Sequence, residues 1–112
     1  MYWNDAKHYC ETLEFENSHL VEIYNSTQQT FLKERLLQNN ENSQLWIGLT
    51  DSEEEGVWKW ASSGNIATYF SWGKGEPSNK GHNCVRLYYG EDYAWFDNTC
   101  NTHYGFICQF DF

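Results

Sequence analysis

Four cysteines in a chain of 112 residues limit what this sequence can fold into more than any other feature. They are Cys10, Cys84, Cys100 and Cys108. An even number in a small, aromatic-rich domain favours two disulfides and an oxidising compartment. Zinc binding would favour a close Cys-x-x-Cys pair, which the sequence lacks. Spacing alone leaves all three pairings of the four cysteines open.

The length of the chain fits one domain, and we expect residues 1–112 to form it. No apolar run approaches the roughly 20 residues that a membrane span needs. The polar start of the chain, with Asn4, Asp5 and Lys7, does not resemble a signal peptide. A signal or anchor would therefore have been removed or would lie upstream.

Acidic residues outnumber basic ones by 16 to 7, which gives a net charge of −9. This charge disfavours nucleic acid as a partner, because phosphate backbones are repelled. Abundant carboxylates also supply the ligands that calcium sites need. Solubility alone explains the same surplus, so charge does not decide between a metal site and an acidic surface.

Hydrophobic periodicity predicts two helices, a long loop and several short strands. The helices are expected at residues 3–13 and 26–38, the second with Ser26 and Gln29 as a capping box. The loop is expected at residues 61–81, which are rich in Ser, Gly and Asn and long enough to carry function. The predicted strands are residues 45–49, 57–60, 84–88, 94–96 and 104–108. This order of elements is typical of an α+β domain.

Several motifs together resemble the C-type lectin-like family, and they occur in that family's order along the whole chain. They are Trp46-Ile47-Gly48-Leu49, Glu76-Pro77-Ser78, Trp95-Phe96-Asp97 and Phe106-Ile107-Cys108. The resemblance implies two helices flanking antiparallel strands, with a long irregular loop that binds the ligand. The family usually begins with a strand before its first helix, and this sequence shows none.

The resemblance also implies a disulfide pairing, Cys10 with Cys108 and Cys84 with Cys100. In the chain-entropy model these bridges contribute about 4.7 and about 3 kcal/mol to stability. That is a large share of the roughly 5–15 kcal/mol that stabilises a typical domain.

In the resembled family, a calcium ion in the long loop binds two sugar hydroxyls, and the ligands of the ion also bond those hydroxyls. Matched by position, the side chains expected to bind carbohydrate and metal here are Glu76, Ser78 and Asp97. The Glu76–Pro77 bond is expected to be cis. His82 and Phe96 stand where a Glu and an Asn are expected, so this calcium site is degraded. The competing interpretation is that the three side chains only order the loop.

A second calcium position of the family matches Asp51, Glu55, Asn79 and Asn83, all of which offer oxygen ligands. Calcium there would stiffen the loop. The stretch from Asp51 to Gly56 could equally be a solvated acidic turn.

The resemblance therefore implies an extracellular, calcium-assisted glycan-binding domain of the kind used in innate immunity, secreted or part of an ectodomain. The alternative is a calcium-independent domain that binds a protein ligand. A third class, a mineral or ice binder, suits the acidic surface but has no specific motif. No nucleophile motif accompanies the histidines, so no enzymatic activity is expected.

Two further features of the sequence suggest roles at the surface. Tyr88, Tyr89 and Tyr93 could form a platform for a sugar or a protein, because exposed aromatic rings suit both. The triplet Asn25-Ser26-Thr27 is a sequon for N-glycosylation, which occurs outside the cytosol.

Overall fold

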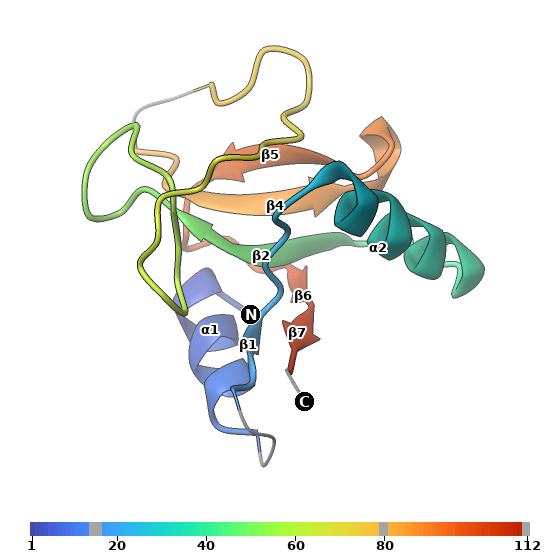
Figure 1. Ribbon diagram of the computed structural model, residues 1–112, viewed down its shortest axis with the longest axis horizontal. Coiled ribbons are helices and arrows are strands. Elements are labelled where there is room, and N and C mark those ends of the chain that lie inside the picture. The colour runs from blue at the N-terminus through green and yellow to red at the C-terminus, as the bar shows by residue number, and fades with distance from the viewer. Residues whose placement is uncertain (14–16, 79–80, 111–112) are drawn as a thin grey trace.

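The computed structural model describes residues 1–13, 17–78 and 81–110, and its elements are shown in Figure 1. Its helices are α1 (Trp3–Glu11), α2 (Ser26–Gln38) and the short 3₁₀ helix η1 (Tyr89–Glu91). Its strands are β1 (His19–Leu20), β2 (Gln44–Thr50), β3 (Lys59–Trp60), β4 (Cys84–Tyr88), β5 (Ala94–Asn98), β6 (Gly105–Phe106) and β7 (Cys108–Gln109). The expected α+β class is confirmed.

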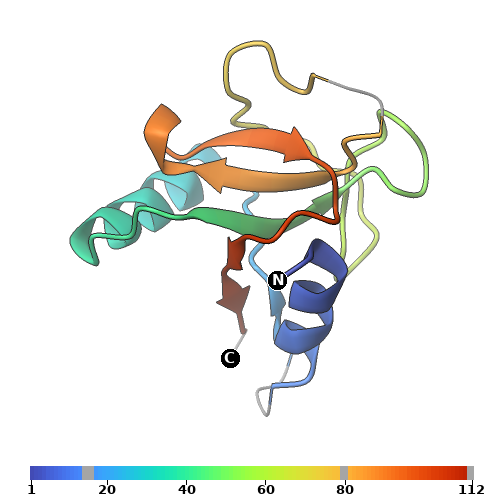
Figure 2. The ribbon, with the colours of Figure 1, turned by 180° about the vertical axis from the view of Figure 1, so that it is seen from behind.

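The strands form two sheets. The larger has the order β3-β2-β4-β5, with β6 added to β2 in parallel, and the smaller consists of β1 and β7. In Figure 1, α1 lies below β2 and the later part of the long loop lies above β5. Figure 2 shows the same arrangement from behind, with β6 and β7 running downward from β2.

Helix α1 buries Trp3, Ala6 and Cys10, which the expected helical spacing places on one face. The helix ends at Glu11, two residues earlier than predicted. The amide of Thr12 donates to the carbonyls of both His8 and Tyr9, at 3.1 and 3.2 Å, which tightens the last turn. Leu13 therefore lies outside the helix.

Helix α2 has the predicted bounds, but the predicted capping box is wrong. The cap is Asn25, whose Oδ1 accepts from the amide of Gln28 at 2.9 Å. Asn caps a helix at least as well as Ser, and its extended backbone places it just before the first turn. Gln29 is buried instead, where its Nε2 donates to the Tyr93 carbonyl and its Oε1 accepts from Trp95 Nε1, at 3.0 and 2.9 Å.

The predicted strand 104–108 is divided between the two sheets. Gly105 and Phe106 pair with β2, whereas Cys108 pairs with β1. Between them, Ile107 donates its amide to the Trp46 carbonyl at 3.4 Å and accepts from the Val21 amide at 2.8 Å. One residue therefore joins the two sheets.

Two apolar clusters form the core. One surrounds the fully buried Trp95 with residues of β2, β4 and the long loop, and the other packs α1 against Trp46. The implied disulfides Cys10–Cys108 and Cys84–Cys100 are both present, with Cα atoms 5.4 and 5.2 Å apart.

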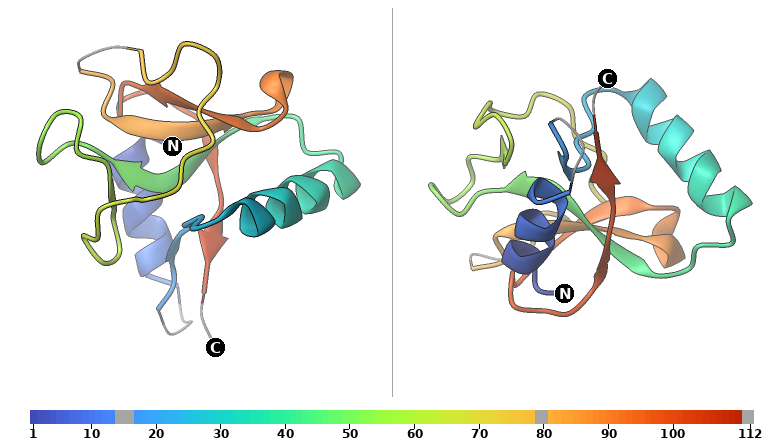
Figure 3. Two further views of the ribbon diagram at one scale, coloured as in Figure 1. Left: turned by 45° about the horizontal axis from the view of Figure 1, so that its top comes forward. Right: turned by 90° about the horizontal axis from the view of Figure 1, so that it is seen from below.

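The base of the long loop is attached to β5. The Trp95 amide donates to the Ser71 carbonyl at 2.8 Å, and the Gly73 amide donates to the Trp95 carbonyl at 2.9 Å. The ring of Phe96 covers Gly73 so closely that a Cβ there would lie 2.3 Å from it. The described part of the loop forms single-residue bridges but no strand, as predicted (Figure 3).

Candidate functional site

The candidate sugar site begins at the turn after the loop base. The Glu76 amide donates to the Gly73 carbonyl at 3.0 Å, and the Glu76–Pro77 peptide bond is cis. The cis bond agrees with the resemblance. The turn holds Glu76 and Ser78 against the end of β5.

Strand β5 contributes Asp97 to this site, and the Asp97 side chain is buried whereas Phe96 and Asn98 are partly exposed. Asp97 is buried, its Oδ2 accepts from the Ser78 amide, and its Oδ1 accepts from the Ser78 hydroxyl, both at 2.9 Å. The Asp97 amide lies 3.4 Å from Glu76 Oε2 and donates to it. The structure therefore brings together the three predicted residues Glu76, Ser78 and Asp97.

Two carboxylates lie side by side in this cluster. Partial burial raises the pKa of Glu76, and the neighbouring Asp97 carboxylate raises it further. The Asp97 amide, which donates to Glu76 Oε2, partly offsets that rise. Such a pair favours a cation or hydroxyl donors, since both relieve the repulsion between like charges.

The two residues that depart from the family pattern add no oxygen side chain. His82 Nδ1 lies 3.8 Å from Asp97 Oδ1, too far for a hydrogen bond, and it is buried without a hydrogen-bond partner among the described residues. Phe96 packs over Gly73, with the Tyr88 ring centroid 5.7 Å away. The site therefore has fewer side chains that offer an oxygen ligand than the family pattern has.

Arg86 supports the site, although its role was not predicted from the sequence. Its Nη1 donates to the Asp97 carbonyl at 3.1 Å, and its guanidinium carbon lies 5.4 Å from the ring centroids of both Phe96 and Tyr104. A signal existed in the sequence, because Arg86 is the only charged residue of a strongly apolar strand. A guanidinium so placed packs against aromatic rings.

The second predicted set of ligands is only partly described, because Asn79 lies outside the described residues. Of the other three, Asp51 and Asn83 are joined directly, because the Asp51 amide donates to the Asn83 carbonyl at 3.1 Å. Glu55 Oε1 accepts from the Gly81 amide, at the end of the long loop, at 3.2 Å. Asp51 is buried and its Oδ2 accepts from the Gly56 amide at 2.9 Å.

Unsatisfied oxygens mark this second set. Asp51 Oδ1 and Asn83 Oδ1 are both buried and have no hydrogen-bond partner among the described residues. Burial raises the pKa of Asp51 to about 6, and the nearby Glu55 carboxylate adds to the rise. Buried orphan oxygens beside a destabilised carboxylate suit a hard cation. No three His, Cys, Asp or Glu side chains gather as a metal centre in the described ranges, so amide oxygens would have to complete the shell.

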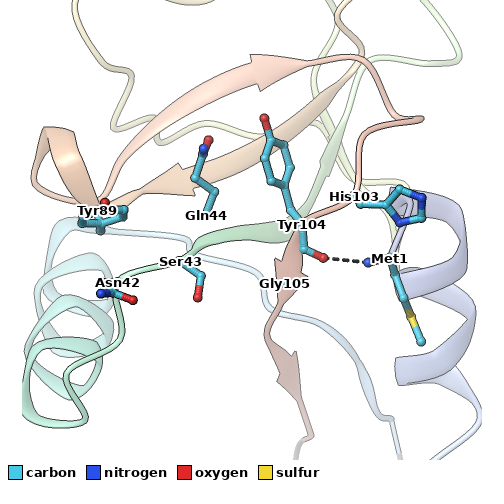
Figure 4. Close-up of a pocket in the computed structure, with 8 residues that line it drawn as sticks. All are labelled: Met1, Asn42, Ser43, Gln44, Tyr89, His103, Tyr104 and Gly105. Atoms are coloured by element: carbon cyan, nitrogen blue, oxygen red, sulfur yellow. Dashed lines mark hydrogen bonds between the residues drawn. The ribbon is translucent and has the colours of Figure 1, made fainter.

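The predicted tyrosine platform is wrong for Tyr93, which is only 2% exposed and whose hydroxyl donates to the Glu41 carbonyl. Tyr93 belongs to the core beside Trp95. Tyr89 is 48% exposed but lines a different hollow of about 420 Å³, together with Gln44, His103 and Tyr104 (Figure 4). Among the residues that the structure describes, no predicted sugar or calcium ligand lines that hollow.

Within the described residues, none of the helices has the length and apolar character needed to cross a bilayer.

Comparison with known proteins adds independent findings. The family profile "Lectin C-type domain" matches residues 1–110. A C-type lectin mannose-binding isoform of Oxyuranus scutellatus is 35% identical, over 96% of this chain and 69% of that protein.

Two solved structures share the fold. The carbohydrate-recognition domain of the mouse scavenger receptor C-type lectin has a TM-score of 0.82 and 35% identity, covering 96% of this chain and 80% of that one. Human lithostathine has a TM-score of 0.85 and 32% identity, covering 97% and 83%. With the cis-proline loop, the two disulfides and the match across nearly all of the sequence, this chain belongs to the C-type lectin family.

Proposed function

We propose that this domain is extracellular and binds glycans through the long loop, with Glu76, Ser78 and Asp97 as the sugar-contacting residues. The observation that carries the proposal is the convergence of two carboxylates and a hydroxyl beside the cis proline. Carboxylates accept from sugar hydroxyls, and a serine hydroxyl can donate or accept. The mannose-binding relative and the carbohydrate-recognition structures support this class of ligand.

We further propose that calcium assists by binding at Asp51, Glu55 and Asn83, with Asn79 as a fourth candidate. The support is the pair of buried, unsatisfied oxygens and the raised pKa of Asp51. The first set of predicted ligands, Glu76, Ser78 and Asp97, fits an ion less well. Both carboxylate oxygens of Asp97 already accept hydrogen bonds from Ser78. Bound calcium would supply positive charge and stiffen the contact between the Glu55 turn and the end of the long loop at Gly81.

The calcium proposal is tested by thermal unfolding with calcium or chelator. An ion at ten times its dissociation constant stabilises the folded state by about 1.4 kcal/mol. In a domain of this size that corresponds to a rise in Tm of roughly 5–10 °C. Asp51→Asn should reduce the rise, whereas Glu76→Gln should retain it. Identical Tm values in both buffers for the wild type would contradict the proposal.

The glycan proposal is tested on an array probed with and without calcium, followed by calorimetric titration of the sugar identified. Glu76→Gln keeps the size of the side chain and removes its charge, so sugar affinity should fall. Glu34→Gln, an exposed change of the same charge on α2, is the matched control. Equal sugar affinity in the wild type and Glu76→Gln would rule out a role for the carboxylate.

Calcium-independent binding of a protein ligand is the second candidate, and one observation favours it. Ile66 is 63% exposed on the long loop and lines a hollow of about 390 Å³ with Tyr24 and Tyr69. Aromatic residues such as these two tyrosines are enriched in protein interfaces. Two results together would support this function instead. The domain would bind no glycan, and it would capture a protein ligand in the presence of chelator. Ile66→Ser should weaken that capture.

A further inference from the structure

The N-glycosylation sequon at the start of α2 has no role in the proposed function. Asn25 is followed by Ser26 and Thr27, which meets the pattern Asn-x-Ser/Thr without proline. The asparagine lies outside the core, and its backbone is extended, with φ −159° and ψ 171°. Access to the side chain is therefore open on the surface.

The two polar atoms of the Asn25 side chain differ in their contacts. Oδ1 accepts from the Gln28 amide and caps the helix. Nδ2 has no hydrogen-bond acceptor among the described residues. Glycosylation uses only the amide nitrogen, so capping and modification engage different atoms of one side chain.

The surroundings have room for a sugar. A hollow of about 380 Å³ runs along the first turns of α2, lined by Ser26, Thr27, Thr30, Phe31 and Glu34. Phe31 is 58% exposed there, and Tyr24 on the other side of Asn25 is 50% exposed. A polar oligosaccharide at this position would cover apolar rings that otherwise face water.

We propose that Asn25 carries an N-linked glycan and still caps α2. In the transfer, Asn25 Nδ2 loses one proton and bonds the anomeric carbon of an oligosaccharide carried on a lipid diphosphate. The bond between that carbon and the diphosphate oxygen breaks, and the lipid diphosphate leaves. The proposal rests on the extracellular location proposed above, but not on glycan binding by the loop.

Two substitutions at Thr27 test the modification without touching the cap. Wild type and variants are secreted from a eukaryotic host, and intact mass is measured before and after peptide-N-glycosidase treatment in heavy-oxygen water. Wild type and Thr27→Ser should carry a glycan whose release labels residue 25, and Thr27→Ala should carry none. A secreted wild type without glycan, or a glycan that persists in Thr27→Ala, overturns the proposal.

Hydrogen exchange tests the retained cap. The Gln28 amide should exchange as slowly in the glycosylated wild type as in unglycosylated Thr27→Ala, and faster in Asn25→Ala, which lacks the cap. Fast exchange in the glycosylated protein would show that the glycan displaces the cap. Sugar binding by the loop, and its dependence on Glu76, is measured separately and does not decide this outcome.

Discussion

Asp97 occupies the central position among individual residues of the site. Its two carboxylate oxygens accept from Ser78, its amide donates to Glu76, and its carbonyl accepts from Arg86. A single buried residue therefore fixes the loop turn, the strand end and the supporting guanidinium. His82 approaches this residue without bonding it, which makes position 82 the natural place to alter the chemistry of the site.

Restoring the family ligands should strengthen calcium binding at the first set. His82→Glu combined with Phe96→Asn adds one carboxylate and one amide oxygen beside Asp97. We expect calcium affinity to rise on the order of tenfold, measured by calorimetry. His82→Gln with Phe96→Asn is the control without the added charge, and both variants need a stability check because Phe96 packs on Gly73. Equal calcium affinity in the two double variants would show that no ion binds there.

Asp51 should make stability depend on pH in calcium-free buffer. Because burial raises the pKa of the folded state to about 6 from 3.8, the folded protein binds a proton more tightly than the unfolded chain does. Stability is therefore highest below about pH 4 for this group and falls as pH rises to about 6, by a few kcal/mol at most. Asp51→Asn should flatten this part of the profile in urea unfolding from pH 4 to 7. A wild-type profile that rises across the same window would contradict the assignment.

Among the elements, α2 and β5 are linked by one polar side chain. Gln29 bonds both the Tyr93 carbonyl and Trp95 Nε1, and all three residues are buried. The link matters for the site because Trp95 also holds the base of the long loop through its backbone. Helix α2 is thereby connected to the loop through β5.

Gln29→Ala should destabilise the domain by roughly 2–4 kcal/mol, since it leaves one buried donor and one buried acceptor unpaired. Gln38→Ala, near the exposed end of the same helix, should cost less than about 0.5 kcal/mol. The measurement is equilibrium unfolding in urea at constant slope. Similar losses in the two variants would mean that the Gln29 bonds contribute little.

Local sequence patterns predicted the helices and strands in which apolar residues recur at regular spacing. The bounds of α2 and of Cys84–Tyr88 were predicted correctly, because helical spacing and apolar runs are visible in sequence. The end of α1 and the Asn25 cap depend on individual hydrogen bonds to residues three or four positions away, and the division of the last strand at Ile107 depends on partners distant in sequence. Periodicity carries no information about those partners.

The site itself was only partly open to sequence reasoning. The grouping of Glu76, Ser78 and Asp97 came from the family resemblance, since 19 residues separate Ser78 from Asp97 and no spacing rule joins them. Arg86 and the closure of Phe96 on Gly73 came only from the structure. The single-domain prediction for residues 1–112 remains a prediction.

At the scale of the whole molecule, the two disulfides enclose very different lengths of chain. Cys10–Cys108 spans a separation of 98 residues and joins α1 to β7, whereas Cys84–Cys100 spans 16 and joins the start of β4 to the turn after β5. The first thus constrains almost the entire fold, and the second constrains the side of the sheet next to the candidate sites.

Removing the larger bridge should therefore cost more stability. In the chain-entropy model, the loss is about 4.7 kcal/mol for Cys10→Ala with Cys108→Ala and about 3 kcal/mol for Cys84→Ala with Cys100→Ala. Urea unfolding of the two double variants measures the difference. The opposite order would show that native-state packing, not loop closure, dominates.

The larger bridge also determines how the domain responds to tension. Force applied at residues 1 and 110 travels from Cys10 to Cys108 through one covalent crosslink and bypasses the chain between them. The long loop, both candidate ligand sets and β2 to β6 all lie inside that bypassed segment. A force that pulls on the two ends of the chain would therefore place little load on a ligand bound at the loop. The domain would behave as a short, stiff link, and its ligand binding would be independent of tension between its ends.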